Sequence, residues 1–256
     1  MTSFVELAQG RLETLDIPAL AAGRPEILLL HEGLGCVSMW RDFPARLAEA
    51  TGCRTVAYSR LGFGRSAPRS APYTPRFIHE EAFGAIPALR ERLGIGNVVM
   101  IGHSTGASMA LVHASANESP VAGVVAMAPL TTVEGSNVES IERARTLYET
   151  TDWRSRLARH HDDVDAVFYG WNDTWLRPDF RGWNILDDLR RVRAPVLAIL
   201  GSDDEYSTTA QVAAIAANVP DPSRFQSLLL PGCGHAPHRE RPDAVLQAVM
   251  GFLGTV

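Results

Sequence analysis

A serine between two glycines stands in the first half of the chain, within Gly102-His103-Ser104-Thr105-Gly106. It follows an apolar run at 98–101 and precedes a helix-like stretch at 107–117. A strand, the pattern Gly-x-Ser-x-Gly and a helix together predict a nucleophile elbow, a sharp turn that pushes the serine Oγ clear of a sheet. The pattern alone arises by chance in roughly one such chain in ten. A glycine-rich turn without chemistry is therefore the alternative.

A serine hydroxyl needs a base, which is usually a histidine oriented by a carboxylate. Asp203 and Asp204 follow one apolar run, and His235 follows the next. In a wound sheet, functional groups collect beyond the carboxyl ends of the strands. The order serine, acid, histidine therefore predicts a triad of Ser104, His235 and one of the two aspartates. His238, three residues after His235, is the reserve candidate for the base.

The elements that must hold these residues alternate along the chain. Apolar runs predict strands, and stretches with apolar residues every three or four positions predict helices. The predicted strands are 26–30, 54–58, 97–101, 121–127, 196–200 and 225–230, after a hairpin at 4–17. The predicted helices are 38–50, 74–93, 104–117, 208–218 and 242–253. This order predicts an α/β fold with a mostly parallel, doubly wound sheet and helices on both faces.

Residues 130–193 interrupt the alternation, with helical patterns and no convincing strand. We predict a core of residues 1–129 and 194–256 and an inserted helical segment between them. This segment would cover the strand ends, and its aromatic side chains would either wall an apolar substrate pocket or form a small core of their own. Its helical patterns are at 140–150, 163–171 and 183–189. The expected substrate-binding residues are Tyr169, Trp171, Trp175 and Trp183.

Composition narrows the class of protein. With 256 residues, 46% hydrophobic and 21% charged, the chain fits one large globular domain, or one domain with an insertion. A net charge of −5 gives no electrostatic reason to expect a nucleic acid or an anionic membrane as a partner. No apolar run approaches the ~20 residues of a bilayer span, and the first ten residues lack a signal-peptide pattern. The three cysteines follow no metal-ligand spacing, so we expect a cytoplasmic protein with free thiols.

Taken together, these motifs resemble those of the α/β-hydrolase fold along nearly the whole chain. The matching segments are His31-x-Gly33-x-Gly35, residues 59–66, the elbow at Ser104, Gly201-x-x-Asp204 and Gly234-His235. In that family the acid is usually the third residue after the glycine, which favours Asp204 over Asp203. The resemblance also implies that residues 130–193 form a cap.

The resemblance further implies an oxyanion hole made of two backbone N–H groups. One would come from Thr105, and the other from Gly33, with Leu34 as the second choice. Glu32 stands where similar enzymes usually carry a glycine. Because a carboxylate would destabilise an oxyanion, we expect Glu32 to turn away, toward a backbone group or Arg60. A role in substrate recognition is the alternative for Glu32.

Two other histidine-containing stretches have simple explanations. His103, beside the nucleophile, is expected to pack or to support the site. The sequence His160-His161-Asp162-Asp163 looks like a metal cluster, but adjacent positions of a helix point about 100° apart. We therefore expect a solvated turn in which Asp162 or Asp163 caps a helix.

These residues predict a serine hydrolase. His235 takes the proton from Ser104 as the serine attacks an acyl carbon, and no cofactor or metal is required. The default substrate is a small-molecule carboxylic ester, while lactones, thioesters and amides share the mechanism. An acyltransferase, a C–C bond hydrolase and a non-catalytic ligand receptor on the same fold are the alternatives. The oligomeric state, monomer or homodimer, stays open.

Overall fold

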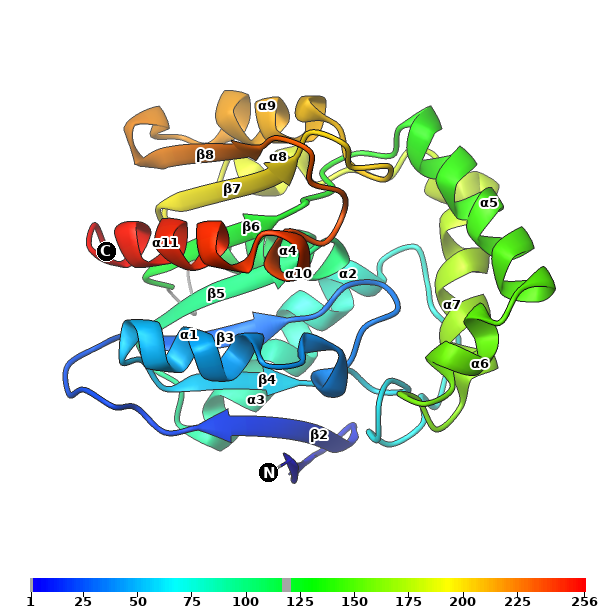
Figure 1. Cartoon of the computed structure of the whole chain (residues 1–256), viewed down its shortest axis with the longest axis horizontal. Helices are drawn as coiled ribbons and strands as arrows, with labels where there is room; N and C mark the ends of the chain where they lie inside the picture. The colour runs from blue at the N-terminus through cyan, green and yellow to red at the C-terminus, as the bar shows by residue number, and fades with distance from the viewer. Residues whose placement is uncertain (1, 117–120) are drawn as a thin grey trace.

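A computed structural model describes residues 2–116 and 121–256. At its centre lies an eight-stranded sheet of order β1-β2-β4-β3-β5-β6-β7-β8 (Figure 1). The strands are β1 (Thr2–Leu7), β2 (Gly10–Ile17), β3 (Glu26–Leu30), β4 (Thr55–Tyr58), β5 (Val98–His103), β6 (Gly123–Met127), β7 (Val196–Gly201) and β8 (Phe225–Leu230). β2 pairs antiparallel with β1 and β4, and the other pairings are parallel. The predicted mostly parallel sheet and edge hairpin are confirmed.

Helices follow the strands in alternation. The α-helices are α1 (Phe43–Thr51), α2 (Phe77–Glu80), α3 (Ile86–Leu93), α4 (Thr105–Ala114), α5 (Gly135–Thr150), α6 (Trp153–Leu157), α7 (Val164–Leu176), α8 (Leu186–Leu189), α9 (Thr209–Asn218), α10 (Pro237–Glu240) and α11 (Pro242–Leu253). Shorter turns are η1 (Val37–Trp40), the π turn η2 (Glu81–Ala85), η3 (Pro178–Phe180) and η4 (Pro222–Arg224). The predicted end of one helix at Asn117 lies outside the described residues.

Side chains of the central strands alternate between two apolar clusters, one on each face of the sheet. On β5, Val98 and Met100 join the cluster that contains side chains of α2, α3, α4, α8 and α9. Val99 and Ile101 join the cluster that contains side chains of α1 and α11, the helices in front of the sheet in Figure 1. Every residue of β5 is buried. A strand covered on both faces is uniformly apolar, which explains the runs in the sequence.

Several predicted helices differ from the structure at their boundaries: the one predicted at 140–150 begins at Gly135, and the one predicted at 163–171 ends at Leu176. The helix predicted at 38–50 begins only at Phe43, because Arg41 adopts a positive φ after the turn η1. The helix predicted at 74–93 continues through Pro87 by widening into the π turn η2. Proline has no N–H to donate, and a π turn accommodates the missing bond. The helix predicted at 183–189 is confined to α8.

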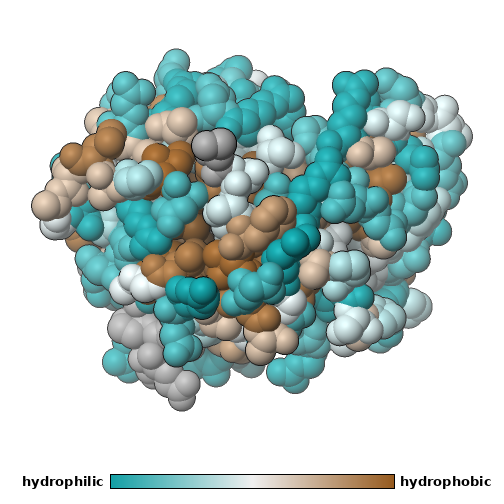
Figure 2. All heavy atoms as spheres, turned by 90° about the horizontal axis from the view of Figure 1, so that it is seen from below, coloured by the Kyte–Doolittle hydropathy of each residue, from teal (hydrophilic) through white to brown (hydrophobic). Residues whose placement is uncertain are grey.

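Helices α5, α6 and α7 lie beyond the carboxyl ends of the strands, at the right of Figure 1. They have an aromatic cluster of their own, in which the rings of Tyr148 and Phe168 stack with centroids 3.6 Å apart. Seen from below, this part of the molecule is covered mostly by hydrophilic side chains (Figure 2). α8, by contrast, packs against α4 and α9. Within the described residues, no helix is long and apolar enough to cross a membrane.

Candidate active site

The turn between β5 and α4 forces Ser104 into an unusual backbone conformation, with φ 54° and ψ −120°. A non-glycine residue at positive φ costs of order 1–3 kcal/mol and persists only where its surroundings hold it. The Ser104 N–H donates to the Met127 carbonyl oxygen at 2.9 Å. A Cβ on Gly102 would come closer than 3.0 Å to the carbonyl of Gly106, and one on Gly106 closer than 3.0 Å to that of Leu30. Both glycines are therefore required for the close approach of strand and helix.

His235 lies against Asp204, with its Nδ1 2.8 and 2.9 Å from the two carboxylate oxygens. The Asp204 side chain is fully buried, and its Oδ1 also accepts the backbone N–H groups of Tyr206 and Ser207. A carboxylate at Nδ1 selects the tautomer with the proton on Nδ1, which leaves Nε2 with a free lone pair. Asp203 instead accepts from the neighbouring serine hydroxyl. The structure thus brings Asp204, and not Asp203, to His235.

Ser104 and His235 line the same cavity, whose volume is about 290 Å³. Its walls are largely apolar on the side of the helical segment, with Leu130, Ile141, Trp153 and Leu157, and Met39 of η1 adds a further apolar side chain. Two predicted substrate-binding residues, Trp171 and Trp175, lie in this wall. Trp153 was not predicted as a lining residue, because nothing in the sequence distinguishes it from the aromatic side chains of the cluster around Tyr148 and Phe168. The cavity is therefore polar at the strand ends and apolar opposite them.

The other two predicted substrate-binding residues lie elsewhere among the described residues. Tyr169 lines a second cavity on the other side of α7. Trp183 packs in the main core, stacked on Phe180 with ring centroids 5.4 Å apart and edge-on to Trp175 at 5.7 Å. The structure does not bring Tyr169 or Trp183 to the cavity of Ser104. Helical periodicity explains the position of Tyr169, because only one stripe of α7 can face that cavity. Trp183 lies beyond the end of α7, where the chain packs on the core.

The predicted oxyanion-hole residues border the same cavity or its nucleophile. Thr105 is the buried first residue of α4, and Gly33 and Leu34 both line the cavity. A Cβ on Gly33 would come closer than 3.0 Å to the indole nitrogen of Trp171. Only a glycine lets the loop pass beneath this ring. The assignment of the Thr105 and Gly33 N–H groups as oxyanion donors stays a prediction.

The Glu32 carboxylate faces His103, with Oε2 3.4 Å from Nδ1. A Cβ on Gly35 would collide with this carboxylate, so the glycine makes room for it. Arg60 binds the main chain instead: its guanidinium donates to the carbonyl oxygens of His31 and Glu32 at 2.7 and 2.8 Å. The carboxylate therefore turns toward His103 rather than toward Arg60.

His103 connects Glu32 to the loop that carries His235. Its Nε2 donates to the His235 carbonyl oxygen at 2.6 Å, while its Nδ1 faces the Glu32 carboxylate. Both neighbours of the ring are hydrogen-bond acceptors, so His103 lies between the Glu32 carboxylate and the His235 main chain. Burial raises the pKa of Glu32, but the hydrogen bond and charge of His103 outweigh it and hold that pKa well below its usual range. The Glu32 carboxylate and the His103 ring thus line the cavity together with Ser104.

Other histidines near the site are neutral structural groups. His238 is buried against the rings of Trp40, Phe43 and His103, and burial holds its pKa well below the usual value. It packs against these rings, whereas the imidazole that contacts the Asp204 carboxylate is that of His235. Burial also lowers the pKa of His161, to about 4.

The stretch His160-His161-Asp162-Asp163 behaves partly as predicted. Asp163 caps α7 by accepting the Ala166 N–H at 3.0 Å. His161, however, is not solvated: its Nδ1 accepts the N–H of Gly64, and its Nε2 donates to the carbonyl of Leu34, both at 2.9 Å. Across the described residues, no group of histidine, cysteine and acidic side chains could hold a metal ion.

Comparisons with known proteins agree with this architecture. A model described as "Alpha/beta hydrolase family" matches residues 27–248. The chain is 26% identical over 266 residues to a non-heme haloperoxidase of Rhodococcus erythropolis, covering 91% of this chain and 93% of that protein. It is 23% identical over 258 residues to a proline iminopeptidase of Lactobacillus delbrueckii subsp. bulgaricus, covering 85% of each.

Solved structures give the same result for the fold. The proline iminopeptidase of Mycobacterium smegmatis superposes with a TM-score of 0.78 at 20% identity, over 100% of this chain and 98% of that one. The enol-lactonase of Burkholderia xenovorans LB400 has a TM-score of 0.78 at 20% identity, over 98% of this chain and 100% of that one. At such identities the likeness concerns the fold alone.

Proposed function

The chain belongs to the alpha/beta hydrolase family and is a hydrolase, and from this premise we propose that it cleaves a carboxylic ester through an acyl-enzyme on Ser104. The proposal is carried by the arrangement of Ser104, His235 and Asp204. A serine in a strained elbow shares a cavity with a histidine whose other ring nitrogen is held by a buried carboxylate. This arrangement supports nucleophilic acyl transfer on geometric grounds.

In the proposed reaction, Asp204 keeps the proton of His235 on Nδ1, so that Nε2 removes the proton of Ser104. The serine Oγ attacks the acyl carbon, and the N–H groups of Thr105 and Gly33 stabilise the oxyanion. The imidazolium then gives its proton to the departing alcohol. A water molecule, deprotonated by His235, attacks the acyl carbon and releases the acid.

We propose that His103 and Glu32 position the base. The hydrogen bond from His103 to the His235 carbonyl fixes the loop that presents the imidazole. The Glu32 carboxylate faces the other ring nitrogen of His103 and holds the ring in this orientation. This arrangement accounts for an acidic residue at the site of the family's usual glycine.

The substrate class follows from the cavity. A volume of about 290 Å³ with apolar walls suits a small to medium, partly apolar acyl group. We propose that residues 130–193 form the cap that closes over it. The names of relatives, a proline iminopeptidase and an enol-lactonase, keep amide and lactone bonds within reach of the same chemistry.

A substrate panel tests the proposal. Purified protein is assayed with p-nitrophenyl esters of increasing acyl length, with lactones, with thioesters and with prolyl amides. We expect the esters of short and medium chains to be cleaved, and Ser104→Ala to abolish turnover while Ser70→Ala, in an exposed loop, retains it. Turnover that survives in Ser104→Ala would contradict the proposal, and preferential cleavage of another acyl bond would replace the ester with that bond.

A further inference from the structure

Gly33, the proposed second donor of the oxyanion hole, lies in the loop that follows β3. Its N–H donates to no acceptor in the part of the chain that the structure describes. A donor that stabilises an oxyanion must be free in this way, and it must also be held in one direction before the reaction begins. The peptide group of Gly33 therefore needs an anchor at its other end, the carbonyl of Glu32.

The guanidinium of Arg60, in the loop after β4, provides this anchor. The Glu32 carbonyl and the Gly33 N–H belong to one planar trans peptide group, so they point in opposite directions. Arg60 Nη2 donates to the Glu32 carbonyl oxygen at 2.8 Å, and Nη1 donates to the His31 carbonyl oxygen at 2.7 Å. Two bonds from one rigid planar group to consecutive carbonyls oppose any rotation of the peptide between Glu32 and Gly33.

The ring of His31 holds the same peptide group. Its Nε2 accepts the backbone N–H of Arg60 at 3.1 Å, so its proton is on Nδ1, which donates to the Glu32 carbonyl oxygen at 2.8 Å. Burial holds the pKa of His31 well below its usual value, and the charge of Arg60 acts in the same direction. The Gly35 N–H also donates to the Glu32 oxygen, at 3.2 Å. Three donors thus converge on one carbonyl oxygen, and the N–H of the same peptide group is left free.

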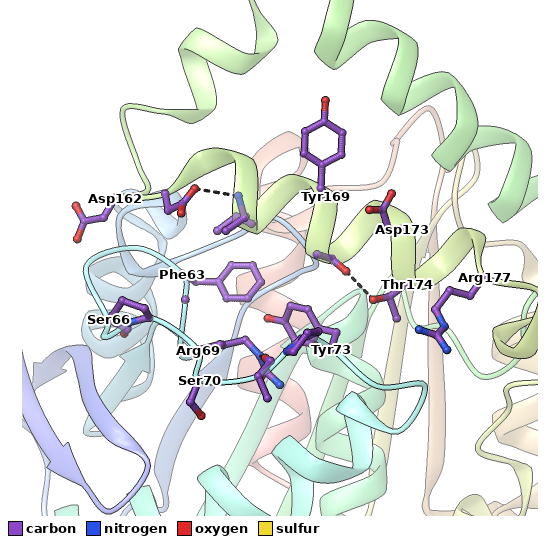
Figure 3. Close-up of a pocket in the computed structure, with 18 residues that line it drawn as sticks. Phe63, Ser66, Arg69, Ser70, Tyr73, Asp162, Tyr169, Asp173, Thr174 and Arg177 are labelled. Carbon is purple, nitrogen blue, oxygen red and sulfur yellow. Dashed lines mark hydrogen bonds between the residues drawn. The ribbon is translucent and has the colours of Figure 1, made fainter.

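The surroundings of Arg60 keep its guanidinium in place. The residue is 3% exposed, and its guanidinium lies over the Phe63 ring, 4.6 Å from the centroid. Figure 3 shows Phe63 and Tyr73 projecting from this loop toward α7. Burial raises the pKa of Glu81 and the charge of Arg60 opposes the rise, but the Glu81 carboxyl accepts from the Tyr58 hydroxyl at 2.6 Å. The guanidinium itself is bound to the two main-chain carbonyls.

We propose that Arg60 is a positioning residue of the hydrolase, which holds the Glu32–Gly33 peptide so that the Gly33 N–H stays directed at the oxyanion. Hydrogen bonds in a chain polarise one another, so a cation at the carbonyl also strengthens the N–H as a donor. Arg60 is not among the residues that line the catalytic cavity as the structure describes it, so it acts through the main chain alone. The inference rests on the proposed function, because it takes Gly33 as an oxyanion donor.

Steady-state hydrolysis of a p-nitrophenyl ester by Arg60→Met and by Arg90→Met tests the proposal. Each variant replaces a buried arginine that binds a main-chain carbonyl, and Arg90 binds that of Gly96, which precedes the amino end of β5. Loss of a whole oxyanion donor costs about 10²–10³ in kcat. We expect a misdirected donor in Arg60→Met to lower kcat about 10- to 100-fold with KM within about threefold. Arg90→Met should lose stability and keep kcat within about twofold.

The amide of Gly33 gives a second readout, which does not depend on turnover. In full-length protein labelled with ¹⁵N-glycine, NMR relaxation should show this amide to be as rigid as the folded backbone in the wild type and in Arg90→Met. In Arg60→Met its order parameter should fall, because the carbonyl of the same peptide group has lost its anchor. An unchanged Gly33 amide in folded Arg60→Met would overturn the proposal.

Normal kcat in Arg60→Met, or an equal loss of kcat in Arg90→Met, would overturn this inference and leave the proposed function intact. A wild-type protein that cleaves none of the acyl substrates would instead overturn the proposed function. Thermal melting confirms that each variant is folded. If Arg60→Met is not, Arg60→Lys replaces it, because an ammonium group keeps the charge but lacks the planar fork. Its kcat should then fall about fivefold or more with KM retained, and an unchanged kcat would again overturn the inference.

Discussion

On the sheet side of the catalytic cavity, polar side chains are buried and joined by hydrogen bonds; on the helical side, aromatic rings stack and the ion pairs face solvent. The sheet side contains Asp204, His235, His103 and Glu32, linked in that order. The helical side contains the stacked pair Tyr148–Phe168 and the exposed pair Arg154–Asp165.

The difference separates two tasks. A buried polar chain has one satisfied arrangement, since every unpaired member would be costly. It therefore suits groups that must keep a fixed geometry. Apolar contacts are non-directional and tolerate changes of shape and size, and exposed ion pairs contribute little. The helical side therefore suits a wall that adapts to the substrate, and the predictions below separate these two tasks.

The largest effect is expected at the acid of the sheet side. Asp204→Asn replaces the acceptor of the His235 Nδ1 proton with an amide that favours the wrong tautomer, and kcat for ester hydrolysis should fall on the order of 10⁴-fold. Asp203→Asn is the matched control, because this carboxylate accepts from the adjacent Ser202 hydroxyl at the surface. Steady-state kinetics compare the two. If Asp203→Asn were the damaging change, the acid would be misassigned.

Two tryptophans distinguish packing from substrate contact on the helical side. Trp183→Ala removes a core ring, and the free energy of unfolding should fall by about 3–5 kcal/mol. Trp171→Ala should instead change the ratio of kcat/KM between long and short acyl esters by about tenfold, because its ring lines the cavity. Denaturant unfolding and the ester series give the two readouts. If both variants lost only stability, or both changed only the preference for acyl length, the distinction between a packing and a substrate-contacting tryptophan would be wrong.

His161 joins the two sides, since its ring bonds the loop at Leu34 and the loop at Gly64. Burial lowers its pKa from 6.5 to about 4, so the unfolded chain binds the proton more readily between these values. The contribution of His161 to the free energy of unfolding is therefore complete above pH 6.5, and about 3 kcal/mol should be lost as the pH falls to 4. Denaturant titrations at a series of pH values measure this loss. In His161→Gln, the fall in the free energy of unfolding between pH 6.5 and 4 should be smaller by about 3 kcal/mol. An unchanged pH slope would mean that this ring is not held neutral.

A smaller effect is expected from Glu32 and His103, the residues proposed to position the base. Glu32→Gln removes the carboxylate that faces His103, and kcat should fall roughly 10- to 100-fold with little change in KM, as expected for a displaced base. His103→Gln should act alike. If the two form one unit, the double variant is no worse than the worse single one. Fully additive losses would mean that Glu32 acts on the substrate directly.

Local patterns made the elbow, the succession of strands and helices along the chain and the order of acid and histidine predictable. The glycines at 102 and 106 are required by contacts within a few ångströms of backbone, and buried strands must be uniformly apolar. Such constraints act on neighbouring residues and leave a mark in the sequence. The capping of α7 by Asp163 is another example of this kind.

Contacts between distant segments left no such mark. Glu32 and His103 are far apart in the sequence, and residue type alone favours Arg60 equally as the partner of Glu32. His161 reads as a polar turn residue, because nothing local shows that Gly64 and Leu34 supply its partners. Likewise, the Trp183 side chain enters the main core because of the way the end of the helical segment packs there. These placements follow from tertiary structure and not from residue type.

Labelling with a fluorophosphonate probe tests the central claim most directly, because the probe reacts with a serine that a neighbouring general base activates. We expect peptide mass spectrometry to find the label on Ser104, and labelling to disappear in Ser104→Ala and to slow strongly in His235→Ala, in proteins that melt as the wild type does. Failure of the folded wild-type protein to label at Ser104, or label on another residue, would contradict the claim that the elbow carries the nucleophile.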